Sequence, residues 1–162
     1  MNNQWKSFLE SQSALISDEG IVRFDNADHY PACVLFDLSQ LGLIRVSGED
    51  AQTFLQGQFT NDTRDVTENR SQLSAYCSPK GRMLANFRVF QYQGDYMLQM
   101  PHETLSTVVK RLPMFILMSK AKVTNASDEF VTIGIAGECA ETLLVNHFKS
   151  IPAQPGDTTQ QN

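Results

Sequence analysis

The segment SAYCSPKGRMLANFRVF, at residues 74–90, concentrates the side chains that could do chemistry. It combines a cysteine, a Pro-Lys-Gly-Arg turn and an Asn-x-Arg pair. A cysteine thiol becomes a nucleophile when a base lies beside it, but nothing in the sequence places a histidine near Cys77. We therefore interpret Cys77 as a small apolar residue of the core rather than as a catalytic group.

The Pro-Lys-Gly-Arg turn raises the question of phosphate binding. A P-loop has several glycines ahead of its Lys-Ser/Thr pair and opens into a helix, whereas a strand-like sequence follows Gly81 here. The turn therefore predicts a β-hairpin, in which the glycine supplies the backbone freedom. Two interpretations of its charges remain: a solvated hairpin tip, or an attraction of Lys80 or Arg82 for an anionic ligand.

Asn86 and Arg88 are two residues apart in an alternating segment, so they share one face of the predicted strand. Leu84 and Phe90 would lie on the same face. An amide beside a guanidinium can recognise a planar polar ligand or a carboxylate. The alternative is that this face is wet and the pair is only solvated.

Residues 56–62 form a second polar candidate, with five hydrogen-bonding side chains in seven positions. Three of them are Thr, Asn and Asp, which commonly bond the backbone of their own turn. Gln56 and Gln58 have no such local habit, and they are therefore the better candidates for contacting a ligand.

The composition limits the classes of function. The chain has 162 residues, 41% of them hydrophobic and 19% charged, which is typical of one globular domain with a real core. The net charge of −5 and the pI near 5.1 argue against binding to a nucleic-acid backbone, so we expect no direct nucleic-acid partner.

Membrane insertion and secretion are also disfavoured. No apolar run approaches the roughly 20 residues of a membrane span, and the N-terminal segment lacks the apolar stretch of a signal peptide. The three cysteines, Cys33, Cys77 and Cys139, show neither metal-ligand spacing nor a disulfide framework. We expect a cytoplasmic protein with reduced thiols.

The apolar patterns predict an α+β fold, in which helices pack on one face of an antiparallel sheet. We expect residues 1–150 to form the domain, with residues 151–162 as a flexible tail or linker. The nearly all-apolar strand at 32–38 should lie deep in a sheet. The last two strands should form a pair. Expected strands are 32–38, 42–48, 72–78, 82–92, 95–100, 120–126 and 130–136. Expected helices are 4–16, one that starts within 47–50 and ends near 57, 102–112 and 138–149.

Taken together, residues 35–137 resemble folate-binding proteins of the YgfZ type, which are related to the aminomethyltransferase (T protein) of the glycine cleavage system. The Ser-Gly-Glu-Asp segment should form the start of a helix. Its acidic residues would then lie in the first turn, where the helix dipole favours negative charge. The matching residues, in order, are Ser47-Gly48-Glu49-Asp50, Leu55-Gln56-Gly57-Gln58, Thr60, Asp62, Cys77 to Met83, Asn86, Arg88 and Lys120-Ala121-Lys122-Val123.

The resemblance implies the N-terminal folate-binding domain of the aminomethyltransferase-like fold, with tetrahydrofolate as the ligand. It also implies a role in maintaining iron–sulfur enzymes and, through them, in tRNA modification. By resemblance the partners are iron–sulfur enzymes and a C-terminal half that packs on this domain. Leu41 stands where some relatives carry a tryptophan in the folate site. The implied ligand-binding residues are Leu41, Gln56, Gln58, Asn61, Lys80, Asn86 and Arg88.

Two alternatives to folate binding remain. One is a folate-dependent aminomethyltransferase, but the positions where that branch carries two aspartates are Ala85 and Asn86 here. Without a carboxylate there, the group best placed to assist proton transfer is missing. The other is a non-catalytic interaction module that needs a C-terminal half absent from this sequence. We expect a binding protein rather than a classical enzyme, with no catalytic and no metal-binding residues.

Overall fold

The computed structural model describes residues 2–18, 21–24 and 32–161. They form two compact units, where the sequence predicts one domain over residues 1–150. The first unit comprises Met1–Leu41 and Ser127–Ile151, and the second comprises Gly42–Ala126 and Pro152–Asn162. Among the described residues, no helix is both long enough and apolar enough to cross a membrane.

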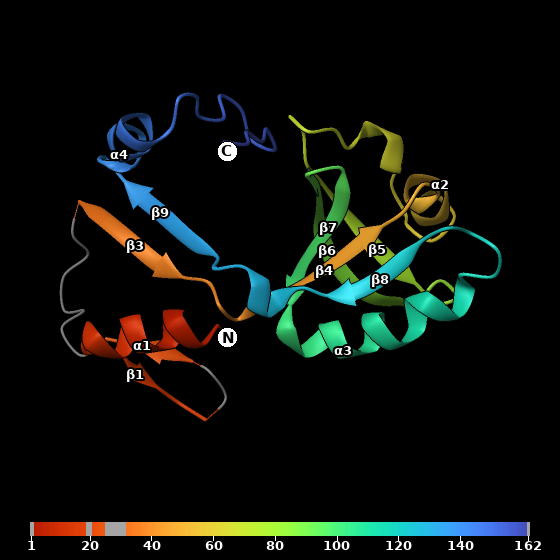
Figure 1. Ribbon diagram of the computed structural model, residues 1–162, viewed down its shortest axis with the longest axis horizontal. Helices are drawn as coiled ribbons and strands as arrows, with labels where there is room; N and C mark the ends of the chain where they lie inside the picture. The colour runs from red at the N-terminus through yellow and green to blue at the C-terminus, as the bar shows by residue number, and fades with distance from the viewer. Residues whose placement is uncertain (1, 19–20, 25–31, 162) are drawn as a thin grey trace. The chain divides into compact units, whose positions relative to one another are not determined.

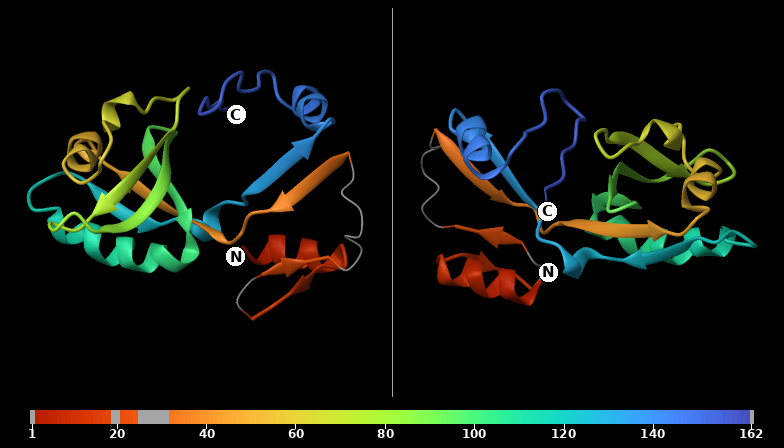
Figure 2. Two further views of the ribbon diagram at one scale, coloured as in Figure 1. Left: turned by 180° about the vertical axis from the view of Figure 1, so that it is seen from behind. Right: turned by 45° about the horizontal axis from the view of Figure 1, so that its top comes forward.

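The second unit is built on a five-stranded sheet in the order β5-β6-β7-β4-β8 (Figure 1). Strand β6 pairs antiparallel with β5 and β7, and β4 pairs antiparallel with β8. Helix α3 (His102–Arg111) lies along one face of the sheet, as Figure 2 also shows. The strands are β4 (Leu41–Ser47), β5 (Gln72–Cys77), β6 (Met83–Tyr92), β7 (Asp95–Pro101) and β8 (Lys122–Asn125), and the short helices are α2 (Ala51–Gln56), η1 (Thr63–Asp65) and η2 (Leu112–Phe115).

The core lies between this sheet and α3. Strand alternation turns Phe87 and Val89 toward the helix, and both are buried, as are Leu105 and Val108 of α3. Burying such side chains contributes about 1.5–3 kcal/mol each relative to exposing them, before the entropy of ordering is subtracted. The predicted α+β class, with an antiparallel sheet and a helix on one face, is confirmed.

The opposite face of the sheet, which we call the second face, carries a mixture of polar and apolar side chains. In the strand register Arg88 lies opposite Leu73 and Gln99, and directly opposed residues share a face. The predicted division of the β6 side chains between the two faces of the sheet is correct, because Asn86 is exposed and Arg88 is half-buried. The second face comprises Leu73, Ala75, Leu84, Asn86, Arg88, Phe90, Met97 and Gln99.

The Ser-Gly-Glu-Asp segment serves a different purpose from the one predicted. Helix α2 begins at Ala51, and Asp50 makes no capping hydrogen bond with its side chain. Instead Asp50 Oδ2 accepts from the Lys120 backbone N–H at 2.7 Å, and Lys120 Nζ lies 2.7 Å from Glu49 Oε2. Gly48 has φ +112°, and a Cβ there would collide with the Lys120 carbonyl. The segment therefore fastens the chain entering β8 to the end of β4.

The first unit contains a two-stranded sheet made by β3 (Cys33–Asp37) and β9 (Ile133–Gly137). The predicted pairing of the last two strands is wrong, because β8 pairs with β4 and β9 pairs with β3. The prediction that β3 lies deep in a sheet is also wrong: Leu35 is 55% exposed, since a two-stranded sheet encloses little. The remaining elements of this unit are α1 (Asn3–Ser11), β1 (Leu15–Ile16), β2 (Val22–Arg23), η3 (Ser127–Glu129) and α4 (Ala140–His147).

The cysteines also differ from expectation. Cys33 and Cys139 form a disulfide with their Cα atoms 5.4 Å apart, which the sequence separation of 106 residues concealed. The β3–β9 register explains the pair, because Cys33 lies opposite Gly137, two residues before Cys139. The prediction that no disulfide joins the cysteines is therefore corrected. Cys77 is the free cysteine and is half-buried.

The tail expected to be flexible is hydrogen-bonded to the second unit. Gly156 accepts from the Ser71 backbone N–H at 2.7 Å, and the Thr158 N–H donates to Asn69 at 2.9 Å. Asp157 closes a turn onto Gln154, since its N–H donates to the Gln154 carbonyl at 3.0 Å. The sequence Gln-Pro-Gly-Asp is typical of such turns, and the glycine adopts φ +91°.

Candidate functional site

The strongest candidate site is a cavity of about 340 Å³ in the second unit, which we call the Arg88 pocket. Strand β6 supplies its floor, because Arg88, Phe90 and Tyr92 alternate onto one side of the strand. The tail supplies part of its wall. The pocket is lined by Ser71, Arg88, Phe90, Gln91, Tyr92, Pro152, Asp157, Thr158, Thr159 and Gln160.

The guanidinium of this pocket is held by a short hydrogen-bonded chain. Arg88 Nη1 donates to Ser71 Oγ at 3.0 Å, and Ser71 Oγ donates to the Gly156 carbonyl at 2.8 Å. A guanidinium has five N–H donors, so this contact orients Arg88 while leaving donors for a ligand. The arrangement positions a half-buried cation that can bind a carboxylate through two parallel hydrogen bonds.

Aromatic and acidic groups complete the chemistry of the Arg88 pocket. Phe90 and Tyr92 present rings on the same side of β6 as Arg88, and rings favour contact with a planar ligand. Asp157 supplies a carboxylate that lies 3.9 Å from Arg70 Nη1. The pocket can thus accept a planar, partly apolar ligand that carries an anionic group.

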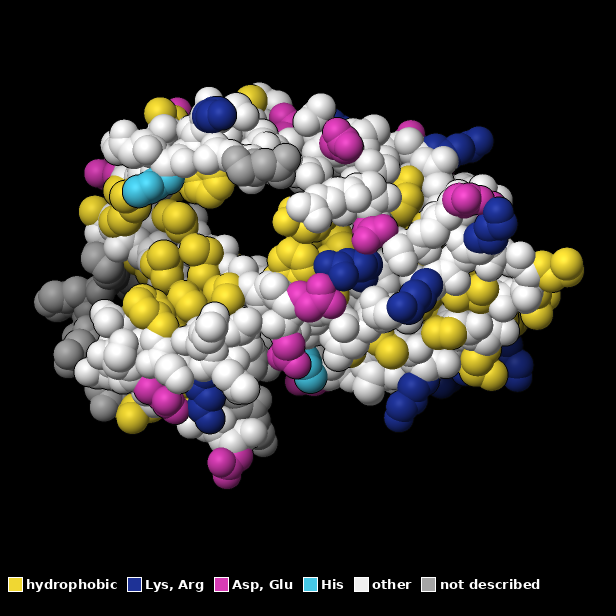
Figure 3. Space-filling model, viewed as in Figure 1, with side chains coloured by type: hydrophobic (Ala, Val, Ile, Leu, Met, Phe, Trp, Pro, Cys, Tyr) yellow, Lys and Arg dark blue, Asp and Glu magenta, His cyan; other side chains and the backbone are white. Residues whose placement is uncertain are grey.

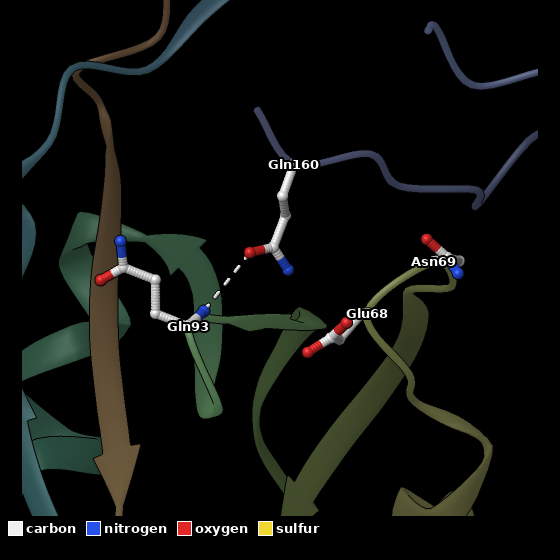
Figure 4. Close-up of a pocket in the computed structure, with 4 residues that line it drawn as sticks. All are labelled: Glu68, Asn69, Gln93 and Gln160. Atoms are coloured by element: carbon white, nitrogen blue, oxygen red, sulfur yellow. Dashed lines mark hydrogen bonds between the residues drawn. The ribbon is translucent and has the colours of Figure 1, made fainter. Parts of the chain in front are cut away.

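A second cavity, of about 370 Å³, shares Gln160 with the Arg88 pocket. Figure 4 shows its four lining residues, with the Gln93 backbone N–H donating to Gln160 Oε1 at 3.4 Å. The other two are Glu68 and Asn69. Since these four residues include an acid and no cation, this cavity suits an anionic ligand less well.

A third cavity, of about 300 Å³, lies at the end of β5. Gln58 and Cys77 both line it, so Gln58 does not face the Arg88 pocket. Its lining residues are Gly57, Gln58, Tyr76, Cys77, Ser78, Pro79, Arg111 and Phe115.

The other polar residues of the predicted loop have local structural roles. Gln56 Oε1 accepts from the Thr63 N–H at 2.6 Å and so fixes η1. Asn61 is exposed, its Oδ1 accepts from Thr60 Oγ1 at 2.9 Å, and its N–H donates to Ser74 Oγ at 3.3 Å. The expectation that side chains of this turn bond the backbone nearby is confirmed for Asp62, whose Oδ1 accepts from the Arg64 N–H at 2.9 Å. The Asn61 side chain bonds the Thr60 side chain instead, and the bond from Gln56 to the Thr63 backbone was not expected.

Asp62 and Arg64 form an exposed ion pair in the same loop. Arg64 Nη2 lies 2.5 Å from Asp62 Oδ2, and the Arg64 backbone N–H donates to Asp62 Oδ1 at 2.9 Å. The side-chain hydrogen bond from Arg64 is the main reason that the pKa of Asp62 falls from 3.8 to about 2. The same contact raises the pKa of Arg64. Both charges are therefore engaged with each other.

The remaining predicted residues lie apart from the Arg88 pocket. Lys80 is exposed in the hairpin turn, which the Ser78 N–H closes by donating to the Arg82 carbonyl at 2.8 Å. Leu41 is half-buried at the start of β4. Asn86 shares the second face with Arg88 but does not line its pocket. Of the seven predicted residues, only Arg88 lines this cavity.

The sequence prediction missed Ser71, the aromatic pair and the tail. Strand alternation already placed Phe90 beside Arg88, so the signal for that residue was present. The Gln-Pro-Gly-Asp turn was the available signal for the tail, but its composition is equally typical of a linker. Within the part of the chain that the structure describes, no cluster of His, Cys, Asp and Glu could hold a metal ion.

One further surface feature is an exposed apolar segment between α3 and β8. Leu117 is 88% exposed and Met118 is 96% exposed, beside the exposed Met114 and Phe115. Figure 3 shows apolar side chains at this edge of the second unit. An interaction module would use such a surface, because contiguous exposed apolar groups mark contact sites.

Comparison with known proteins gives a consistent result. Residues 24–156 match the family model described as the GCVT N-terminal domain. A curated protein named "tRNA-modifying protein YgfZ" from Hamiltonella defensa is 34% identical over 117 residues, which is 72% of this chain and 34% of that protein. Its namesake from Photobacterium profundum is 32% identical over 130 residues, or 80% of this chain and 37% of that protein. The chain therefore spans about a third of the length of these relatives.

A solved structure shares the fold. The glycine cleavage system aminomethyltransferase T from Bartonella henselae superposes with a TM-score of 0.71 at 18% identity. The match covers 90% of this chain and 43% of that protein.

Proposed function

Because the chain belongs to the GCVT N-terminal domain family, we propose that it is the tetrahydrofolate-binding domain of a YgfZ-type protein. Its role is to support iron–sulfur enzymes and, through them, tRNA modification. The names of the similar curated proteins support the tRNA-modification part. The observation that carries folate binding is the Arg88 guanidinium, oriented by Ser71 beside two aromatic side chains.

The residues of the Arg88 pocket fit a reduced folate chemically. A folate combines a flat pterin, an aminobenzoyl ring and a glutamate with carboxylates. Phe90 and Tyr92 can contact a ring, while Arg88 can pair with a carboxylate or with the polar edge of the pterin. The cavity of about 340 Å³ is at the small end of ligand sites, so it holds one end of the ligand. Lys80 or Arg82 would then attract the glutamate end through long-range charge.

Binding fits this site better than aminomethyl transfer. Strand β6 carries no carboxylate between Met83 and Tyr92. Ala85 is 4% exposed and faces the core, so even an acidic side chain at that position would not point toward the Arg88 pocket. The carboxylate that lines the pocket, Asp157, comes from the tail and is near Arg70. We therefore assign a binding role.

The test is a calorimetric titration of the chain with 5-formyltetrahydrofolate, a stable reduced folate. We expect saturable binding, with a Kd that rises roughly 10- to 100-fold in Arg88→Gln, because a hydrogen bond to a charged group contributes about 1.5–3 kcal/mol. Arg23→Gln is the matched control, since it removes the same charge from an exposed position in the first unit.

Two results would contradict folate binding at this site. One is no binding by the wild-type chain, and the other is equal affinity of the Arg88→Gln and Arg23→Gln variants. Circular dichroism of each variant establishes that it is folded. Arg88→Lys is a second test of the guanidinium. The lysine keeps the charge but loses the forked geometry, so we expect its affinity for the folate to lie between those of the wild type and Arg88→Gln.

For compartment and partners, we propose the cytoplasm, iron–sulfur enzymes as clients, and packing against a C-terminal half in proteins of the relatives' length. In a reducing cytoplasm the Cys33–Cys139 pair would be largely in the thiol form. Its oxidation state is thus a property to measure in cells.

A further inference from the structure

A second arginine of the second unit has a buried nitrogen without a partner. Arg111 Nε is excluded from solvent and makes no hydrogen bond within the described residues. Leaving a buried donor unsatisfied costs about 1–3 kcal/mol, more for a charged group. Native proteins keep few such groups, and strain, a functional role, or bound water and ions account for those that remain.

The surroundings of Arg111 form a small polar cavity, the third cavity described above, of about 300 Å³. Arg111 ends α3, and Gln58 and Ser78 bring an amide and a hydroxyl from elements far apart in the sequence. Ser78 Oγ accepts from the Arg82 N–H at 3.2 Å, so its own proton remains available to donate. Three kinds of donor therefore line one cavity.

The charge and shape of this cavity favour one class of ligand. None of its eight lining residues is acidic, although the chain as a whole carries a net charge of −5. A guanidinium fork matches a carboxylate through two hydrogen bonds. Phe115 and Pro79 offer apolar surface for the carbon skeleton of a ligand.

We propose that the Arg111 cavity binds a small organic carboxylate, with Arg111 as its counter-ion and Ser78 and Gln58 as further donors. This site is separate from the Arg88 pocket, because the two cavities share no lining residue. It does not depend on the folate proposal.

Cys77 provides the readout, because it lines the cavity and is the free cysteine of the chain. The rate of its alkylation by iodoacetamide is measured with benzoate, with the neutral isostere benzamide, and with inorganic phosphate. We expect saturating benzoate to slow alkylation at least 5-fold, and benzamide to have little effect. Equal protection by benzamide, or protection by phosphate without protection by benzoate, would overturn the carboxylate assignment.

Variants identify the residue responsible. Arg111→Gln should abolish the protection by benzoate, whereas Lys110→Gln, an exposed neighbour on α3, should keep it. If Arg111→Gln does not fold, Ser78→Ala serves as the second variant and should raise the benzoate concentration needed for half-protection. Undiminished protection in the folded Arg111→Gln variant, or in Ser78→Ala if Arg111→Gln is unfolded, would refute the site. Arg88→Gln should retain full protection, which separates this site from the folate pocket.

Discussion

Arg88 Nη1 lies 3.0 Å from Ser71 Oγ and donates a hydrogen bond to it. The same hydroxyl donates to Gly156 in the tail at 2.8 Å. A single serine therefore connects the cation of the candidate folate site to the segment that forms part of its wall. Ser71 is 6% exposed, so water competes little for these bonds.

Removing this hydroxyl should loosen the tail and the arginine together. We expect Ser71→Ala to lower the free energy of unfolding by about 1–2 kcal/mol, because both hydrogen bonds of the buried hydroxyl are lost. Hydrogen exchange should speed up at Thr158, whose N–H donates to Asn69. Urea unfolding and exchange measured by mass spectrometry check both effects. Ser106→Ala, at an exposed position of α3, is the control, and an equal exchange rate in the two variants would contradict the link.

The disulfide predicts how many thiols react before and after reduction. Unfolded, unreduced protein should react with one equivalent of a thiol reagent, at Cys77, and with three after reduction. Reduction should lower the stability by about 2–4 kcal/mol, because the bond closes a long loop in the unfolded chain. In Cys77→Ala we expect no reactive thiol before reduction. Three equivalents from the unreduced wild type would show that the bond is absent.

The sequence predicted those features that depend on neighbouring residues. Strand alternation in β6 correctly separated Phe87 and Val89 from Asn86 and Arg88, because a period of two is a local property. Helix α3 was likewise predicted within one residue, at 102–112 against His102–Arg111, since a proline follows its apolar stripe.

The features that were missed depend on contacts between distant segments. The β3–β9 pair places Cys33 beside Cys139 across 106 residues, and no local pattern carries that information. Gln56 is a different case: it is a ligand candidate because glutamine rarely bonds the backbone of its own turn, but its side chain accepts from the Thr63 N–H seven residues further along the same loop. Most of the predicted site residues do not line one common cavity. A residue type indicates what a side chain can bind, but the fold decides which cavity that side chain faces.

The ion pair between Asp62 and Arg64 sets a pH dependence. The pKa of Asp62 is lowered to about 2 by its hydrogen bonds with Arg64, so the pair stabilises the folded chain above pH 3.8, and this contribution is lost as the pH falls through about 2. Carbon-detected NMR of the side-chain carboxyl should give a midpoint near 2 in the wild type and one closer to 3.8 in Arg64→Gln. Added salt should raise the wild-type midpoint, because both groups are exposed. Arg70→Gln should leave the midpoint in place, and an Arg64→Gln midpoint equal to that of the wild type would exclude the pair as the cause.

Gly48 tests how tightly the end of β4 is joined to the chain entering β8. Gly48→Ala should be strongly destabilising, because φ is +112° and the new Cβ would collide with the Lys120 carbonyl. Gly94→Ala separates the two causes, since Gly94 has φ +85° with nothing within 4 Å of its added Cβ. Backbone strain alone costs about 1–2 kcal/mol, and we expect Gly94→Ala to stay within that range while Gly48→Ala exceeds it by at least about 1 kcal/mol. Urea unfolding of both variants measures the difference, and equal losses would show that the chain near Lys120 moves away at no further cost.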